Sequence, residues 1–183
     1  MKKSLTQLFL VISLCFLLCF TFSCQNQETM AELEEYKAQA EIEAQNKELI
    51  RNYFEELDSG NVEILMEVFA PNALIYYPSN AKPMSREEEL KFHKSVLGAF
   101  AGFHHSIEEL ISAGDKVIGR IIVRGTHKGE FQGIPATGNK IEVSVIPIFR
   151  IEDEKIVELR REIDMLGCMY QLGMELKPKE AEK

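Results

Sequence analysis

The chain has 183 residues, of which 45% are hydrophobic and 27% are charged, and its formal net charge is −8. A globular domain of this length and composition can bury a core without disulfides or structural metals. The acidic balance argues against a nucleic-acid partner, since no cluster of Lys and Arg side chains in the sequence offsets it.

The first 23 residues have the order of a secretory signal peptide. Lys2 and Lys3 provide a positive start, and residues 5–22 are almost wholly apolar. Cys24 follows a small residue, and this arrangement resembles a bacterial lipoprotein signal in which that cysteine is lipidated after cleavage. The alternative is an uncleaved anchor, because about 20 apolar residues can cross a bilayer. Either way, we expect an extracytoplasmic, membrane-anchored protein of the bacterial cell envelope.

Residues 24–45 are rich in Ala, Glu, Gln and Lys, which favour helices, but they include few apolar residues. We interpret this segment as a helical or partly disordered tether without chemistry. Of the four cysteines, Cys168 is the one that remains beyond the signal and the lipidation position, so no disulfide can form within the domain. Its apolar, helical surroundings predict a buried side chain rather than a nucleophile.

Three helices and one strand are predicted in the first half of the domain. An apolar stripe predicts a helix over residues 46–57, and a short second helix is expected over residues 64–69. Residues 73–77 have the composition of a strand. The third helix, residues 85–100, begins with the capping-box sequence Ser-Arg-Glu-Glu.

From residue 104 the apolar period changes to two, which predicts four strands and then a short helix after Asp164. The predicted strands span residues 104–113, 116–127, 140–151 and 156–164. Helices first and antiparallel strands after them predict an α+β fold. A twisted sheet with helices on one side can curl into a half-cone, whose interior is the natural pocket. Pro147, inside the third of these strands, predicts an edge position or a bulge.

Two segments carry a family resemblance. One is the sequence THKGEFQGIPATGNKIEV, residues 126–143, and the other is residues 156–174, with Asp164 and the ending Gln171-Leu172-Gly173. In this order they resemble the SnoaL-like polyketide cyclase, or ester cyclase, family, which has the nuclear transport factor 2-like cone fold. The resemblance covers residues 46–174 and leaves residues 175–183 as a charged tail.

The resemblance implies ring closure of a polyketide by intramolecular aldol chemistry, with neither metal nor cofactor. It implies that Asp164, at the position of the family's aspartate, is the acid/base. The sequence departs from the family pattern in two places. Pro135 is followed by Ala136 where two prolines are common, and Arg160 and Glu162 make a more charged wall than a polyketide pocket needs.

The pattern around Asp164 allows two interpretations, because its strand face can line a pocket or face water. Removal of a proton next to a carbonyl requires a carboxylate whose pKa is raised towards the working pH, as burial in an apolar cone would do. A neighbouring Arg160 would hold that pKa low and Glu162 would raise it. The residues alone do not decide between these two effects.

Other candidates for the pocket are His127, His105 and Tyr77. His127 is in phase with an apolar strand face and is either a structural histidine or a donor to the substrate. His104 and His105 are adjacent, so only one of them can point inward, and His93 is expected at the surface or an interface. No metal-ligand spacing is present, and the glycines of residues 129–138 match no nucleotide-binding fingerprint.

Three functions follow from these patterns. The first is a tethered enzyme, a cyclase, isomerase or hydrolase that uses Asp164 on a small apolar carbonyl compound. The second is a non-catalytic lipoprotein that binds a small molecule in the same cone. The third is a structural homodimer that associates through the face of its sheet.

Overall fold

The computed structural model describes the backbone of residues 2–78, 81–175 and 177, and the side chains of these ranges from residue 29 onward. The chain divides into two units, Met1–Ile42 and Glu43–Lys183. The first unit belongs to helix α1 (Lys2–Asp58), and its residues 29–42 are exposed, so the segment predicted as a tether is a solvated helix there. Side chains of the predicted signal and of Cys24 lie outside the described residues. No helix within the described residues is long and apolar enough to cross a membrane.

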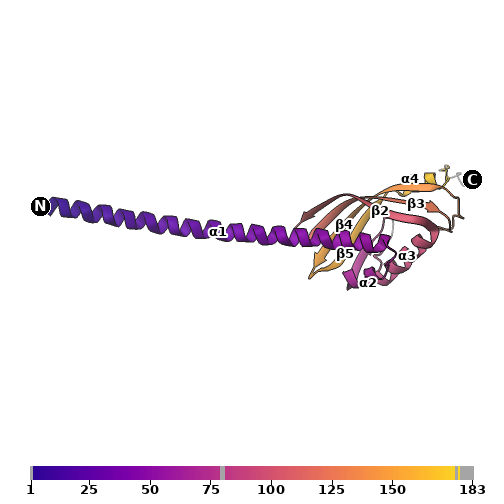
Figure 1. Cartoon of the computed structure of the whole chain (residues 1–183), viewed down its shortest axis with the longest axis horizontal. Coiled ribbons are helices and arrows are strands. Elements are labelled where there is room, and N and C mark those ends of the chain that lie inside the picture. The colour runs from indigo at the N-terminus through magenta and orange to yellow at the C-terminus, as the bar shows by residue number, and fades with distance from the viewer. Residues whose placement is uncertain (1, 79–80, 176, 178–183) are drawn as a thin grey trace, which may run out of the picture. The chain divides into compact units, whose positions relative to one another are not determined.

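The second unit is a five-stranded sheet with helices packed on it (Figure 1). The strands lie in the order β1-β5-β4-β3-β2, with β1 parallel to β5 and every other neighbouring pair antiparallel. Their bounds are β1 Phe69–Tyr76, β2 Phe100–Ala113, β3 Lys116–His127, β4 Lys140–Glu152 and β5 Lys155–Ile163. The helices that accompany α1 are α2 (Ile64–Val68), α3 (Arg86–Ala99) and α4 (Met165–Gln171). This confirms the predicted α+β fold.

Two strands begin earlier than the sequence indicates. β1 starts at Phe69 rather than residue 73, and β2 starts at Phe100 rather than residue 104. Phe69 and Phe100 follow α2 and α3 directly and already have extended backbone angles. Each helix therefore passes into its strand without a turn, and Pro71 and Gly102, which suggest a break in the sequence, lie inside β1 and β2.

The start of α3 confirms the predicted capping box. The Ser85 hydroxyl accepts a hydrogen bond from the Glu88 amide, and the Glu88 carboxylate accepts one from the Ser85 amide at 2.7 Å. Two amides that the helix leaves unbonded are satisfied in this way. The cap fixes where α3 begins, and with it the residues that α3 turns toward the sheet.

The prediction for Pro147 is wrong. β4 lies between β5 and β3, Pro147 pairs with Arg161 of β5, and the β3–β4 register is the same on both sides of Pro147, so it is neither at an edge nor at a bulge. The β3–β4 pairing is interrupted opposite Pro147, at Gly119. A Cβ atom on Gly119 would lie 3.2 Å from Pro147 Cγ. Gly119 therefore leaves the space in which a central strand accommodates a proline ring.

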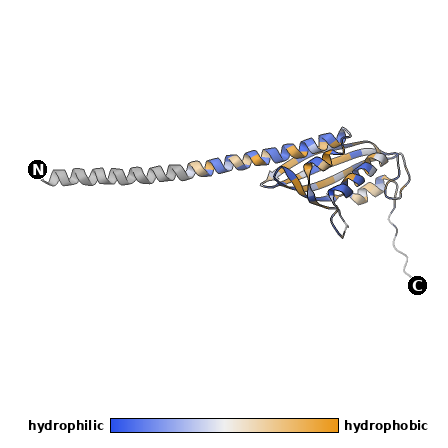
Figure 2. Cartoon of the chain, turned by 90° about the horizontal axis from the view of Figure 1, so that it is seen from below, coloured by the Kyte–Doolittle hydropathy of each residue, from blue (hydrophilic) through white to orange (hydrophobic). Residues whose placement is uncertain are grey.

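The hydrophobic core lies between the sheet and the helices. Figure 2 shows the strands as mainly hydrophobic and much of the helix surface as hydrophilic. Val117, Ile121, Val123 and His127 are buried on one face of β3, as their spacing predicts. On the opposite face of the sheet Ile111, Ile118 and Ile148 are partly exposed and neighbour one another across β2, β3 and β4. A homodimer through this face stays a prediction.

Candidate functional site

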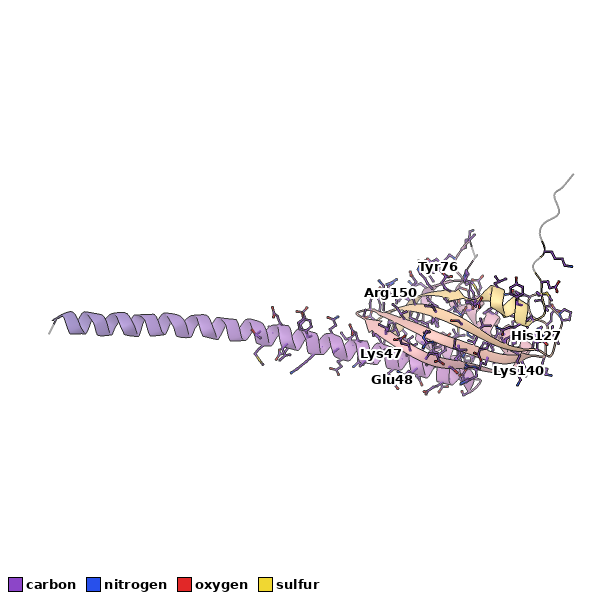
Figure 3. The ribbon with its side chains drawn as sticks, turned by 90° about the horizontal axis from the view of Figure 1, so that it is seen from above. Lys47, Glu48, Tyr76, His127, Lys140 and Arg150 are labelled. Atoms are coloured by element: carbon purple, nitrogen blue, oxygen red, sulfur yellow. The ribbon has the colours of Figure 1, made fainter. Side chains whose placement is uncertain are left out.

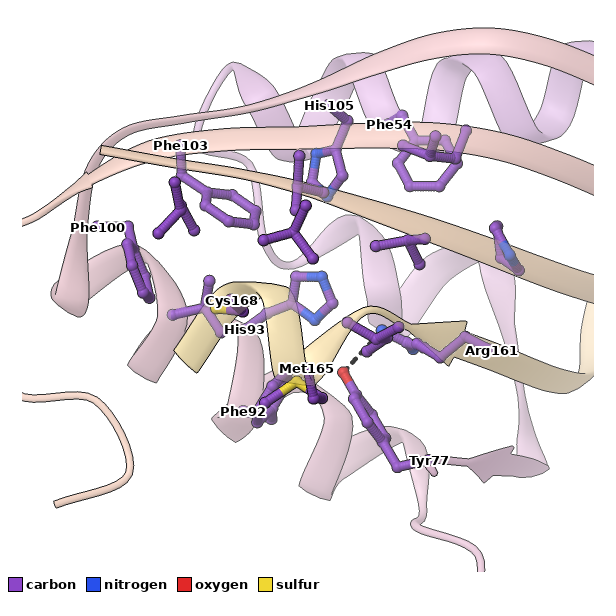
Figure 4. A pocket seen from close by; sticks show the side chains of 18 of the residues that line it. Phe54, Tyr77, Phe92, His93, Phe100, Phe103, His105, Arg161, Met165 and Cys168 are labelled. Carbon is purple, nitrogen blue, oxygen red and sulfur yellow. Dashed lines mark hydrogen bonds between the residues drawn. The ribbon is translucent and has the colours of Figure 1, made fainter. Parts of the chain in front are cut away.

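A cavity of about 110 Å³ lies inside the second unit, between the sheet and the helices (Figure 4). Most of its wall is apolar, and a few polar side chains interrupt it. The apolar and aromatic lining includes Phe54, Phe92, Val96, Phe100, Phe103, Ile121, Val123, Phe131, Val143, Phe149, Leu159, Ile163 and Met165. The polar side chains are Tyr53, Tyr77, His93, His105 and Arg161. The predicted interior pocket is therefore present.

Arg161 is the cationic group of this wall. Its guanidinium pairs with the carboxylate of Glu89 from α3 and donates a hydrogen bond to the Tyr77 hydroxyl at 2.7 Å. Burial lowers the pKa of Arg161, but the charge and hydrogen bond of Glu89 together with Tyr77 and Tyr53 outweigh that effect, and the net shift is upward. Burial would raise the pKa of Glu89, yet Arg161 and His93 hold it at about 2. Both side chains of the pair are therefore charged at neutral pH.

His93 lines the cavity and is 6% exposed, so the prediction that it lies at the surface or an interface is wrong. Its Nδ1 lies 3.1 Å from Glu89 Oε1, one turn earlier on α3. Glu89, His93 and Val96 lie three or four residues apart and are all buried on one side of the helix. The buried side of α3 therefore includes two polar residues, Glu89 and His93.

His105 is the inward-facing member of the His104-His105 pair. Its side chain is 8% exposed, whereas that of His104 is 59% exposed. Asp58, the last residue of α1, lies 2.6 Å from His105 Nδ1 and also accepts a hydrogen bond from the His105 amide at 2.9 Å. Burial lowers the pKa of His105, and the Asp58 carboxylate only partly offsets that effect.

Asp164 does not line the cavity, although its neighbours Ile163 and Met165 do. Its side chain is exposed, and Oδ1 accepts a hydrogen bond from the Gly167 amide at 2.8 Å as the N-cap of α4. The strand alternation of β5 ends here and the helix begins, so the carboxylate accepts a hydrogen bond from one of the free amides in the first turn of α4. The apolar enclosure expected around Asp164 is absent in this structure. Its catalytic role stays a prediction.

Arg160 and Glu162 lie on the outer face of β5, so the prediction that they line the pocket is wrong. Arg160 pairs with Glu158 at 2.7 Å and stacks over the Tyr76 ring, and Glu162 is exposed. The alternation of a strand explains this placement, since it assigns Arg161 to the inner face with Leu159 and Ile163.

Tyr77 lines the cavity, as predicted, and His127 does not. His127 is fully buried at the end of β3 near Lys140 (Figure 3), where its ring stacks on Phe100 at a centroid distance of 5.1 Å. The Thr137 amide donates to His127 Nδ1 at 3.3 Å. These contacts hold the glycine-rich connection against the end of the sheet and favour the structural role for this histidine.

No group of three or more His, Cys, Asp or Glu side chains in the described part of the chain is arranged to hold a metal ion. Cys168 also lines the cavity, and burial together with the nearby Asp164 charge raises the pKa of its thiol. Such a thiol stays protonated at neutral pH, which suits a buried apolar wall better than a nucleophile.

Sequence reasoning missed Glu89, Arg161 and Asp58. Arg161 carries a usable signal, since it is in phase with the apolar residues of β5. Glu89 follows the capping box and looks like another exposed acidic residue of the first turn of a helix, because Glu87 and Glu88 precede it. Asp58 and His105 are 47 residues apart in the sequence, and no local sequence pattern predicts a contact between them.

The chain is also similar to proteins of known family. The model of the SnoaL-like polyketide cyclase family matches residues 47–172. The chain is 30% identical over 131 residues to the aklanonic acid methyl ester cyclase DnrD of Streptomyces peucetius, covering 69% of this chain and 89% of that protein. It is 31% identical to the corresponding cyclase DauD of Streptomyces sp. strain C5, over 69% of this chain and 80% of that protein.

Solved structures share the fold. IdmH of Streptomyces antibioticus is 31% identical with a TM-score of 0.63, and the match covers 70% of this chain and 98% of that one. TsrD of Streptomyces laurentii is 25% identical with a TM-score of 0.64, covering 71% of this chain and 96% of that one. These neighbours have the nuclear transport factor 2-like fold, which confirms the predicted cone.

Proposed function

Because the chain belongs to the SnoaL-like polyketide cyclase family, we propose that it closes a ring in a small, largely apolar carbonyl compound by acid/base catalysis. The observation that carries this proposal is the cavity, which combines an apolar wall with a few convergent polar groups. Family membership supports a cyclase activity, and the cavity supplies a place where the reaction is shielded from water.

The size of the cavity bears on the substrate. At about 110 Å³ it is somewhat smaller than an engineered apolar cavity of about 150 Å³ that binds benzene. A group of about one ring therefore fits the enclosed part, and the rest of a larger ligand would extend toward the mouth. The tight apolar wall selects by shape, and Arg161 and Tyr77 offer hydrogen bonds to an oxygen of the ligand.

Asp164 is the acid/base that we propose from the family position. Ile163 and Met165, its neighbours in the chain, line the cavity, so we expect the side chain to rotate away from the Gly167 amide when the carboxylate acts on a ligand. Loss of the N-cap would accompany that rotation. A ligand that buries the carboxylate would raise its pKa toward that of a useful base.

We propose further that the domain is held at a membrane through a lipid on Cys24. The support is the sequence order of positive start, apolar stretch and cysteine. Mass spectrometry of the membrane fraction of a bacterium expressing the full chain tests this. We expect a mature protein that starts at Cys24 with acyl chains, and a Cys24→Ser variant that remains uncleaved.

The activity test uses aklanonic acid methyl ester as a probe, since that compound is named for the curated relatives. We expect conversion to a product of unchanged mass and different chromatographic retention, and a loss of about 100-fold or more in the rate of Asp164→Asn. Asparagine keeps an oxygen that can cap α4, so a folding defect is not expected. A wild-type protein that converts neither this compound nor smaller diketones would contradict the cyclase proposal.

A second candidate function is non-catalytic binding of the same kind of ligand. The exposed position of Asp164, engaged with Gly167, favours it, because the carboxylate then serves the fold of α4. In this case Asp164→Asn would leave the affinity for the ligand unchanged. A ligand recovered from the purified protein and identified by mass spectrometry would supply the compound for that measurement.

A further inference from the structure

Two polar groups face each other across the cavity. His105 projects into it from β2, and Arg161 with Tyr77 lies on the other side, with the His93 ring between them (Figure 4). The neighbourhood of His105 is otherwise aromatic, with Phe54 at a centroid distance of 4.9 Å and Phe103 at 5.1 Å. A histidine in such a place is shielded from water and oriented by its neighbours.

Asp58 fixes the orientation of His105. The carboxylate accepts the His105 amide through both oxygens, at 3.1 and 2.9 Å, and contacts Nδ1 at 2.6 Å. His104 Nδ1 lies 2.7 Å from the other oxygen, but the His104 side chain is mostly exposed to solvent. Although partial burial acts to raise the pKa of Asp58, the bonds with His105 lower it, so the group is ionised. An ionised carboxylate at Nδ1 requires the proton there and leaves Nε2 with its lone pair.

We propose that His105 is a general base of this enzyme, that Asp58 positions it, and that Arg161 with Tyr77 binds the oxygen that becomes negative in the reaction. This inference rests on the proposed function, a reaction of a carbonyl compound in the cavity. It assigns a proton transfer to a residue inside the cavity, in addition to the role proposed for Asp164, which caps α4 and does not line the cavity. The arrangement of carboxylate, imidazole and substrate proton follows the logic of hydrolytic triads.

The proton balance of the step is complete without a co-reactant. His105 Nε2 takes a proton from the carbon next to a carbonyl, and the electron pair of that C–H bond forms the enolate. The enolate carbon then attacks a second carbonyl of the same molecule, which forms the C–C bond and an alkoxide. Nε2 returns its proton to the alkoxide, so the product is an isomer of the substrate and His105 is neutral again.

The opposite wall suits the enolate oxygen. Within the described residues Arg161 Nε is buried without a hydrogen-bond partner, and so is Glu89 Oε2. A buried donor without a partner is costly, and a ligand oxygen would satisfy it. The titratable groups that act on His105 are Asp58 from α1, His93 from α3 and Arg161 from β5. Burial, His93 and Arg161 each oppose an imidazolium, which keeps the ring neutral and able to accept a proton.

The test has two readouts on the full-length protein. The first is ¹⁵N NMR of the histidine ring nitrogens, in which we expect His105 at neutral pH to be protonated at Nδ1 alone. The second is exchange of the C1 protons of 2-tetralone, a small ring ketone, in D₂O.

His105→Asn keeps a donor toward Asp58 and removes the base, so we expect the rate of exchange to fall by about 100-fold or more. Asp58→Asn should lower the rate and move the pKa of the pH–rate profile downward.

His104→Asn is the matched control, since it contacts the same carboxylate but its side chain is mostly exposed. We expect it to exchange at the wild-type rate, which separates loss of the base from damage around Asp58. Wild-type exchange that survives in His105→Asn, or a His105 ring protonated at Nε2 at neutral pH, overturns the inference and leaves the cyclase proposal standing. A wild-type protein that exchanges no proton overturns both.

Discussion

Arg161 and Glu89 form an ion pair in which the Glu89 side chain is fully buried and that of Arg161 is 10% exposed. The two residues are 72 positions apart in the chain and join β5 to α3 beside the cavity. A buried ion pair adds little net stability compared with two apolar side chains of similar volume in the same place. Removal of one partner, however, leaves the other charge buried without compensation. This relationship makes the polar end of the cavity sensitive to single substitutions.

We therefore expect Glu89→Gln to destabilise the fold by about 3–5 kcal/mol at neutral pH, because Arg161 is left charged and buried. The pKa of Glu89 is about 2 in the folded protein and about 4.5 in an unfolded chain. Its contribution is thus complete above the unfolded value and is lost as the pH falls toward 2. Urea unfolding of both proteins at pH 7, 4 and 2.5 measures this.

Glu87→Gln is the control for that series. Glu87 lies on the same helix but is exposed and pairs with its neighbour Arg86, so we expect almost no change in the free energy of unfolding. A gap between wild type and Glu89→Gln that is as large at pH 2.5 as at pH 7 would contradict the assignment of a charged pair.

Gly119 and Pro147 supply a prediction about the sheet. A Cβ at position 119 would meet Pro147 Cγ and Ile121 Cδ1 at 3.2 Å and Leu110 Cδ2 at 3.3 Å. We expect Gly119→Ala to destabilise the fold by about 1–3 kcal/mol through overpacking. Gly98→Ala is the control, since nothing lies within 4 Å of its added Cβ and the residue is in helix α3. That change should stabilise by about 0.5–1 kcal/mol, and equal effects at both sites would refute the explanation.

The sequence was sufficient for the elements and the cone, because each strand carries a period-two pattern and α3 carries its own capping box. It also identified Tyr77 and His105 as residues that reach the pocket. It failed where the deciding partner is distant in the chain. Asp58 determines the orientation of His105, and Arg161 compensates the charge of buried Glu89. Neither pairing can be recognised from the sequence around the residues involved. Pro147 shows the same limit, since the glycine that accommodates it lies on another strand.

The position of Asp164 shows a different limit. Its residue type and its place after a strand fit a pocket carboxylate and a helix cap equally well. The two roles differ only in the direction of the side chain, and the geometry at the start of α4 decides that direction. Gly167 is part of that geometry, because a Cβ there would overlap Asp164 Oδ2.

This contact predicts non-additive effects of substitutions at Asp164 and Gly167. Asp164→Ala removes the cap of α4 and should cost about 1 kcal/mol. Gly167→Ala in the wild type should also destabilise, because the new methyl group displaces the carboxylate from its position over the helix end. In the Asp164→Ala background the same change should stabilise by about 0.5–1 kcal/mol, since alanine favours the helix and nothing is left to displace. Urea unfolding of the four proteins gives the coupling energy, and strictly additive values would show that Asp164 does not hold the end of α4 in solution.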